Sequence, residues 1–337
     1  MIEKKTVLVL GAGASRPYNF PLGQMLIDQI TRDVTDGKSI YSHLIDCGFK
    51  DSSIKEFSDA LNDSPLSSID IFIETKPEFS KIGRTSIAIA LLPCESVHRL
   101  MHYPREVRLK LIKGYKGEGD SWYHYLFKHL HDPGVPFGEN QLQVITFNYE
   151  RSFEHFLFLA VKSCYPGKNE SEIASMVQTI PIIHLYGSLG RLPWQKQEIG
   201  LSSNVTQYAT PLSPDTLAKA ADSIQIISDN NGVTPEFEKA KETLKNAERC
   251  YFLGFGFYKK NIERLGNELI KLNPKMRKRN AMGTAFNLDI TGQSNAYKFS
   301  DGNLSTEALI NRMIIPNPTL FNEDVYTFLY NHVNFST

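Results

Sequence analysis

Hydrophobic and polar positions along the chain form two alternating kinds of pattern. Short apolar runs rich in β-branched residues are typical of strands that are buried on both faces of a sheet. Runs of this kind occupy residues 6–10, 142–147, 180–185 and 250–255, with a weaker one at 223–227. Apolar residues at helical spacing follow several of these runs, at 22–30, 153–161 and 258–272. Because strands alternate with helices, the chain is expected to form a Rossmann-like α/β fold, an open parallel sheet with helices on both faces.

The long stretch between the first two apolar runs shows helical patterns instead. Apolar residues recur at helical spacing in 67–74, 86–101 and 122–129, with Pro93 marking a break or kink inside the second of these segments. We therefore expect a single domain of 337 residues. Its expected parts are a Rossmann-like core at about 1–35 and 138–298, a helical insertion at about 36–137, and a C-terminal helical tail at about 299–337.

Small or polar residues stand at the end of each of the four main apolar runs. These are Gly11, Ala12, Gly13 and Ser15 at the first, Asn148, Tyr149 and Glu150 at the second, His184, Gly187 and Ser188 at the third, and Gly254 and Gly256 at the fourth. Ligands of open parallel sheets bind outside the carboxyl ends of the strands. The four strand ends together therefore predict a dinucleotide-sized site.

Each of these residues also has a packing interpretation. Gly13 can serve a tight turn, Asn148 can cap the next helix, and His184 can be a satisfied core histidine. The small residues after Leu10 are expected to form an open turn that lets main-chain N–H groups approach a phosphate. The dinucleotide fingerprint G-x-G-x-x-G is incomplete, because Arg16 occupies the place of its third glycine.

Composition narrows the choice of ligand. The 37 Lys and Arg residues balance 37 Asp and Glu residues, so nucleic acid is not expected as a direct substrate. The four cysteines are far apart and form no paired metal-binding motif, so no metal is expected. No apolar run is long enough to span a bilayer, and scattered cysteines fit a reducing compartment, so a cytoplasmic location is expected.

Four segments in order resemble the motifs of sirtuin-like proteins: GAGAS at 11–15, TFNYE at 146–150, HLYGS at 184–188 and FLGFGF at 252–257. The match is strongest to the bacterial branch associated with anti-phage defence, whose members resemble NAD⁺ hydrolases. The resemblance implies that Gly11, Ala12, Gly13 and Ser15 line the pyrophosphate and ribose of NAD⁺. It also places Asn148 and His184 beside the nicotinamide ribose, and Gly254 and Gly256 beside the adenosine ribose.

The chain departs from the sirtuin deacetylases in several places. It lacks their paired-cysteine zinc module, and Phe147 and Glu150 stand where the deacetylases have glutamine and aspartate. The glycine-rich loop continues as RPYNFPLG rather than into an Asp-Phe-Arg run. These differences disfavour acetyl-lysine transfer and leave NAD⁺ as the expected substrate.

Cleavage of NAD⁺ by water sets clear chemical demands. The nicotinamide ring is neutralised as it leaves, so the enzyme must stabilise an oxocarbenium-like ribose and supply water. An asparagine carboxamide can hold that water, and a histidine can take its proton. We therefore assign Asn148 to positioning of water and ribose, and His184 to general-base catalysis. Glu150 has two interpretations, a helix-dipole interaction or a contact to the nicotinamide carboxamide.

The leading hypothesis is thus an NAD⁺ hydrolase that acts as an antiviral defence effector by depleting NAD⁺ when triggered. Such an enzyme needs control, so regulation through a homo-oligomer or a partner is expected, and the resemblance to the family implies a separate partner ATPase or sensor protein. The helical insertion and the C-terminal residues 321–330 are candidate assembly surfaces or, equally, make intramolecular core contacts. The alternatives are a non-catalytic module that binds NAD⁺ or ADP-ribose, and, less favoured, a protein deacylase.

Overall fold

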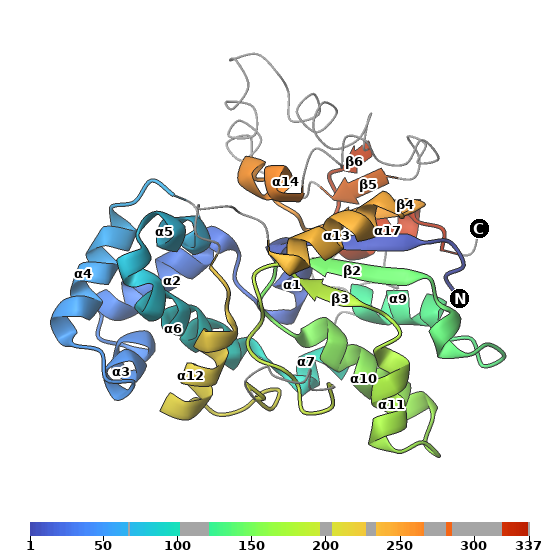
Figure 1. The fold of residues 1–337 in the computed structure, drawn as a ribbon, viewed down its shortest axis with the longest axis horizontal. Coiled ribbons are helices and arrows are strands. Elements are labelled where there is room, and N and C mark those ends of the chain that lie inside the picture. The colour runs from blue at the N-terminus through green and yellow to red at the C-terminus, as the bar shows by residue number, and fades with distance from the viewer. Residues whose placement is uncertain are drawn as a thin grey trace, which may run out of the picture.

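Six parallel strands form an open sheet in the computed structural model, which describes residues 1–66, 68–101, 121–195, 204–226, 234–265, 281–284 and 319–335. The strands are β1 (Thr6–Leu10), β2 (Leu142–Thr146), β3 (Ile182–His184), β4 (Arg249–Leu253), β5 (Ala281–Thr284) and β6 (Thr319–Phe321). Their order across the sheet is β3-β2-β1-β4-β5-β6 (Figure 1). The predicted α/β fold with an open parallel sheet is confirmed.

The central position of β1 in the sheet explains why its sequence is apolar at every position but one. All five of its residues are buried, and Val9 pairs with Ile145 of β2 on one side and with Phe252 of β4 on the other. A strand in the middle of a parallel sheet is covered on both faces, so it gains from apolar residues that point either way. The same argument applies to β4, in which every residue is buried.

The strand order reverses its direction at β1. The chain moves one way from β1 to β2 and β3, then crosses back to β4 and continues to β5 and β6. Right-handed crossovers in opposite directions place their helices on opposite faces. Accordingly α9 and α10 pack together on one face and α13 lies across the other, with α14 beside it (Figure 1). The helices of these two layers are α9 (Trp122–Leu130), α10 (Ser152–Cys164), α11 (Glu170–Val177), α13 (Pro235–Lys245), α14 (Lys259–Leu265) and α17 (Val325–His332).

A separate group of helices lies to one side of the sheet (Figure 1). It contains α2 (Gly23–Thr35), α3 (Ser39–Asp46), α4 (Asp51–Asn62), α5 (Ile69–Thr75), α6 (Ser80–Leu91) and, from later in the chain, α12 (Pro214–Ser223), which packs against α6. Phe57, Phe72 and Phe79 contact one another in its core. The chain turns at Pro93 between α6 and the short α7 (Val97–Met101), as its sequence predicts. Within 36–137 the described residues form helices and no strand, although α9 packs on the sheet layer.

Several local expectations need correction. The segment after β1 forms a four-residue helix, α1 (Ala12–Ser15), instead of an open turn. The expected strand at 223–227 is absent from its described residues, where α12 ends and Ile224 makes an isolated bridge to Gly187. The tail contains β6 as well as α17, so it is not wholly helical. Residues 266–272, the end of the predicted helix at 258–272, and 299–318 lie outside the described part of the chain.

The C-terminal helix α17 serves mainly as a core element. Val325, Phe328 and Leu329 are buried, and Phe328 contacts the Tyr251 ring of β4. Only Tyr330 among the aromatic residues of this helix is strongly exposed. The intramolecular interpretation therefore accounts for the buried face of α17. None of the helices in the described part of the chain combines the length and apolar character that a membrane span requires.

Candidate functional site

The carboxyl ends of β1 and β4 approach each other so closely that only glycine fits between them. The Gly13 N–H donates to the Gly254 carbonyl over 2.9 Å. A Cβ on Gly11 would lie 2.6 Å from the Gly254 oxygen, and a Cβ on Gly254 would lie 2.0 Å from the Ala14 nitrogen. Gly254 also has a φ of +57°, which disfavours any other residue. Contact between the two loops therefore explains these glycines, while Ala12 and Gly13 stay partly exposed at the same edge.

A buried polar cluster lies next to these loops and is formed by residues at the end of α1 and just after β2. The Asn148 Nδ2 donates to the Gly11 carbonyl over 3.0 Å and to the Ser15 Oγ over 2.9 Å. The Ser15 hydroxyl donates in turn to the Glu150 Oε1 over 2.5 Å, and the Ser152 N–H donates to the Glu150 Oε2 over 2.6 Å. Ser15, Asn148 and Glu150 are 2%, 8% and 7% exposed. All three residues of this cluster are therefore buried, and Asn148 keeps the largest exposed fraction of the three.

The pKa of the Glu150 carboxyl is raised above its ordinary value. Burial is the main cause, and the nearby Glu154 carboxylate adds to it, while the hydrogen bonds from Ser15 and Ser152 oppose it. Of the two interpretations that the sequence leaves open, the helix interaction matches the contact to Ser152 at the start of α10. The contact to Ser15 is additional and links Glu150 to Asn148.

His184 lies at the end of β3, but both of its ring nitrogens already have partners. The Nδ1–H donates to the main-chain carbonyl of Asn148 over 3.0 Å, and the Nε2 lies 2.9 Å from the Glu154 Oε1. Burial by itself lowers the pKa of His184, but Glu154 and the Asn148 carbonyl outweigh it, so the pKa is raised. The raised pKa favours the protonated ring, which forms an ion pair with Glu154.

This arrangement changes the role that the sequence assigns to His184. Because both ring nitrogens have partners, neither offers a free lone pair to a water, and this geometry does not place His184 as a general base. It contacts Asn148 through the main chain and not through the carboxamide. His184 therefore orients the segment that carries Asn148. The sequence did hold a sign that Glu154 has a special role. In the apolar segment 153–161, Glu154 and His155 are the two residues with ionisable side chains.

Three further predicted residues, Gly187, Ser188 and Gly256, make their close contacts with residues outside the Asn148 cluster. Gly187 has a φ of +69°, and a Cβ there would lie 2.1 Å from the Ser223 carbonyl oxygen at the end of α12. The Ser188 N–H donates to that same carbonyl over 3.3 Å. Gly256 follows β4, and a Cβ there would meet the Tyr258 ring at 3.0 Å. Packing against α12 and Tyr258 accounts for these residues.

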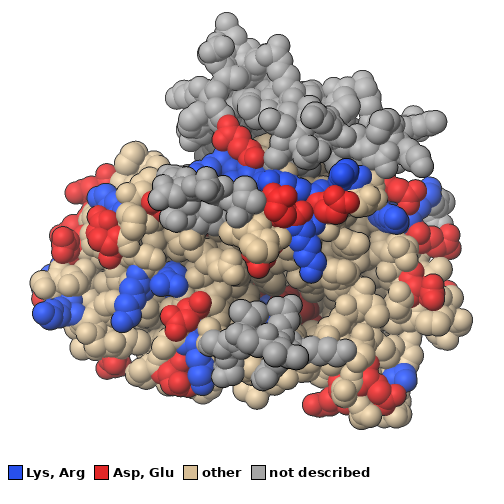
Figure 2. Space-filling model, in the orientation of Figure 1, with Lys and Arg blue, Asp and Glu red and all other residues tan. Residues whose placement is uncertain are grey.

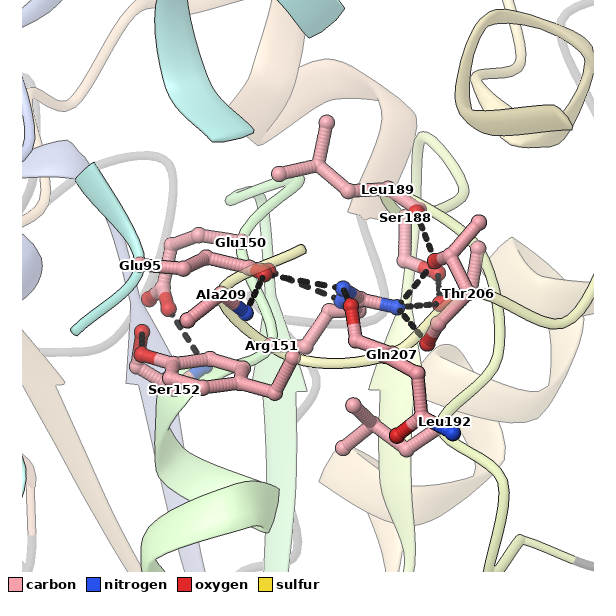
Figure 3. Close-up of polar contacts among 12 residues, drawn as sticks. Glu95, Glu150, Arg151, Ser152, Ser188, Leu189, Leu192, Thr206, Gln207 and Ala209 are labelled. Atoms are coloured by element: carbon pink, nitrogen blue, oxygen red, sulfur yellow. Dashed lines mark hydrogen bonds and ion pairs between the residues drawn. The ribbon is translucent and has the colours of Figure 1, made fainter. Parts of the chain in front are cut away.

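A buried ion pair holds the segment that follows the cluster, and sequence reasoning missed it. The Arg151 guanidinium binds both oxygens of Glu95, each over 2.9 Å, and these side chains are 1% and 0% exposed (Figure 3). Arg151 also donates to the main-chain carbonyls of Gly190, Thr206 and Gln207. Arg151 thus joins β2 to the loops after β3. The sequence feature that could have indicated a buried Arg151 is its position between Glu150 and the start of a mostly apolar helix.

A second polar network connects the helical group to the sheet edge. The Tyr149 hydroxyl donates to the Asp70 carboxylate of α5. Glu74, also on α5 and with a fully buried side chain, binds Lys260 and Arg264 of α14. The pKa of Asp70 is raised to about 6, mainly by burial, with a further contribution from Glu74. These contacts fix α5 over the carboxyl edge, next to Asn148.

The sheet has a hollow at its opposite, amino edge. This hollow has a volume of about 310 Å³ and is lined by Lys5, Thr6, Val7, Gln141, Gln143, Thr243, Asn246 and Ala247. Its lining holds one charged side chain, Lys5, and none of the residues predicted from the strand ends. We therefore place the candidate site at the carboxyl edge, where the glycine loops and the buried cluster meet.

The surface charge and the comparisons with known proteins do not identify a ligand for this site. Figure 2 shows Lys and Arg side chains interspersed with Asp and Glu side chains over one face of the molecule, in line with the balanced composition. No group of three or more His, Cys, Asp or Glu in the described part of the chain is arranged to hold a metal ion. No family model and no curated protein matches the sequence. The candidate site thus depends on the arrangement of its residues.

Proposed function

We propose that this chain is a sirtuin-like NAD⁺ hydrolase, which cleaves NAD⁺ with water to nicotinamide and ADP-ribose. The observation that carries the proposal is the reversal of strand order at β1. Sheets of this order bind dinucleotides in the crevice at the point of reversal. In this chain the loops after β1 and β4 meet at that point, and the Asn148 cluster lies directly beside them.

The Asn148 carboxamide is suited to hold the attacking water. Its two N–H groups are taken by Gly11 and Ser15, so the direction of its oxygen is set. No described residue donates a hydrogen bond to that oxygen, so it can accept one from water or from a ribose hydroxyl. Such positioning lowers the entropic cost of bringing water to the reacting carbon.

The proposed biological role is that of an effector in antiviral defence. An enzyme that depletes cellular NAD⁺ must be inactive until it is triggered. The near-complete burial of Ser15, Asn148 and Glu150 supports a resting state that opens only on a signal. Assembly into a homo-oligomer, or contact with a partner ATPase or sensor protein, would supply that signal. NAD⁺ acts here as the substrate, and the protein is proposed to work in the cytoplasm.

The test is a direct assay of purified protein with NAD⁺, alone and together with the proteins encoded beside it, with products separated by chromatography. We expect ADP-ribose and nicotinamide in equal amounts. Asn148→Ala should reduce the rate at least about a hundredfold, by loss of water positioning. Asn62→Ala is the matched control, because Asn62 is an exposed residue at the end of α4.

Two other outcomes would redirect the proposal. Saturable binding of NAD⁺ or ADP-ribose without turnover, with partner proteins present, would identify a non-catalytic binding module. Release of a free lysine side chain from an acetylated peptide would identify a deacylase. Wild-type turnover that persists in full in Asn148→Ala would refute the assignment of Asn148.

A further inference from the structure

Hydrolysis of NAD⁺ releases a proton from the attacking water, and this proton needs an acceptor. His184 is not available, because its Nδ1–H donates to the Asn148 carbonyl and its Nε2 is paired with Glu154. The nicotinamide leaving group takes no proton either, because its ring nitrogen is neutralised by the electron pair of the broken bond. Another group at the Asn148 cluster must therefore act.

Ser15 and Glu150 have the geometry of a proton relay. The Ser15 hydroxyl donates to the Glu150 Oε1 over 2.5 Å, a short distance that is typical of a hydrogen bond to a charged acceptor. The same hydroxyl oxygen accepts from the Asn148 Nδ2 over 2.9 Å, so its orientation is determined on two sides. An oxygen so placed has one lone pair left to accept a hydrogen bond from a water held by Asn148.

We propose that Ser15 and Glu150 form the proton relay of the hydrolytic step, an inference that rests on the proposed NAD⁺ hydrolase function. The bond between the ribose C1′ and the nicotinamide nitrogen breaks, and its electron pair returns to the nicotinamide ring. The water oxygen bonds to C1′ and transfers a proton to the Ser15 Oγ. The original Ser15 proton passes to the Glu150 carboxylate, so nicotinamide, ADP-ribose and a protonated Glu150 result.

The surroundings of Glu150 favour this role. Its titratable neighbours are Glu154 on α10, His184 on β3, Tyr123 on α9, Cys94 beside α7 and Tyr208 in the loop before α12. Burial and the Glu154 charge raise the pKa of Glu150, which makes its carboxylate a stronger base than an exposed one. The Glu150 charge also raises the pKa of His184, whose ring is paired with Glu154.

The decisive variant is Glu150→Gln, which keeps an oxygen to accept from the Ser152 N–H and presents its NH2 group to the Ser15 Oγ, but cannot take a proton. We expect its kcat to fall at least about a hundredfold while its affinity for NAD⁺ changes little. The wild-type rate should fall as pH drops below the raised pKa of Glu150, and this acidic limb should be absent from the residual activity of the variant. Ser15→Ala should lose a similar factor, and the double variant should lose no more than either single one.

A matched control separates catalysis from helix capping. Glu172 also accepts a main-chain N–H at a helix start, from Asn169 at α11, but its side chain is exposed. Glu172→Gln should leave the rate unchanged. Thermal unfolding checks that each variant is folded, and if Glu150→Gln does not fold, Ser15→Ala decides the question.

The outcomes separate this inference from the proposed function. Wild-type turnover with a rate for Glu150→Gln or Ser15→Ala within about threefold of it would overturn the relay and leave the hydrolase function intact. Loss in Glu150→Gln with full activity in Ser15→Ala would exclude Ser15 as the intermediate carrier. If the wild-type protein forms no ADP-ribose with its partners present, the proposed function fails, and the relay fails with it.

Discussion

The buried pair of Arg151 and Glu95 allows a quantitative prediction that is independent of the proposed chemistry. Arg151→Met removes the positive charge but keeps much of the side-chain volume. It leaves the Glu95 carboxylate, whose side chain is fully buried, with the Ala209 N–H as its remaining described donor. It also deprives the Gly190, Thr206 and Gln207 carbonyls of the Arg151 hydrogen bonds.

The magnitude follows from the desolvation of the remaining charge. Removing one partner of a buried ion pair costs about 3–5 kcal/mol, because the other charge stays buried without compensation. For a chain of this size, roughly 2 °C of melting temperature corresponds to each kcal/mol, so Tm should fall by about 6–10 °C. Glu95→Leu should cost a similar amount, since it leaves the Arg151 guanidinium buried and uncompensated.

Differential scanning fluorimetry and urea titration of the two single variants and the double variant measure these effects. The double variant removes both charges, so it should lose less stability than the sum of the single losses. The control is the pair of Lys162 and Glu170, whose atoms are 2.6 Å apart but whose side chains are 49% and 70% exposed. Glu170→Gln should change stability by less than about 1 kcal/mol.

The reasoning has a clear point of failure. If Arg151→Met and Glu95→Leu each cost less than about 1 kcal/mol, as the exposed control does, the pair is not buried in the way described. Strictly additive losses in the double variant would show that the two side chains do not interact. Either result would also remove the support for Arg151 as the residue that joins β2 to the loops after β3.

Three further predictions concern residues near the candidate site. Asp70→Asn should stabilise the protein at pH 7.5 by up to about 3 kcal/mol. The reason is that the Asp70 pKa rises from 3.8 to about 6 on folding, so the folded carboxylate is penalised above pH 6. Urea titrations should show that this gain in stability vanishes near pH 4. Gly254→Ala should cost more than about 2 kcal/mol through backbone overlap, whereas Gly37→Ala, with a similar φ of +63° and nothing within 4 Å, should cost only about 1 kcal/mol in the same assay. Glu154→Gln should lower the pKa of the His184 imidazole, as followed by NMR titration, and an unchanged pKa would contradict the ion pair.

The sequence by itself determined the parts of this protein that depend on local patterning. Runs such as 6–10 and 142–147 are mostly apolar, and a parallel strand covered on both faces favours that pattern. The alternation with helices then led to the parallel sheet, and the strand ends led to Ser15, Asn148 and Glu150. Both steps depend on residues close together in the chain.

Short strands at the sheet edge were not foreseeable in the same way. Strand β5 has only four residues and β6 only three, and neither stands out from its neighbours by composition. They form because β4 offers an unpaired edge, which provides hydrogen bonds that the segments cannot make alone. The described residues of the segment at 223–227 make main-chain hydrogen bonds to the loop at 186–188 but form an isolated bridge, between Ile224 and Gly187, instead of a strand.

Only the tertiary structure decided which hydrogen-bond and ion-pair partners each side chain at the site has. His184 is separated by 30 residues from Glu154, Arg151 by 56 from Glu95, and Ser15 by 135 from Glu150. Hydrogen bonds and ion pairs depend on distances of about 3 Å and on burial, and neither is encoded in local spacing. The residue types at the strand ends were therefore readable from the chain, whereas the protonation and role of each one followed from partners that only folding brings near.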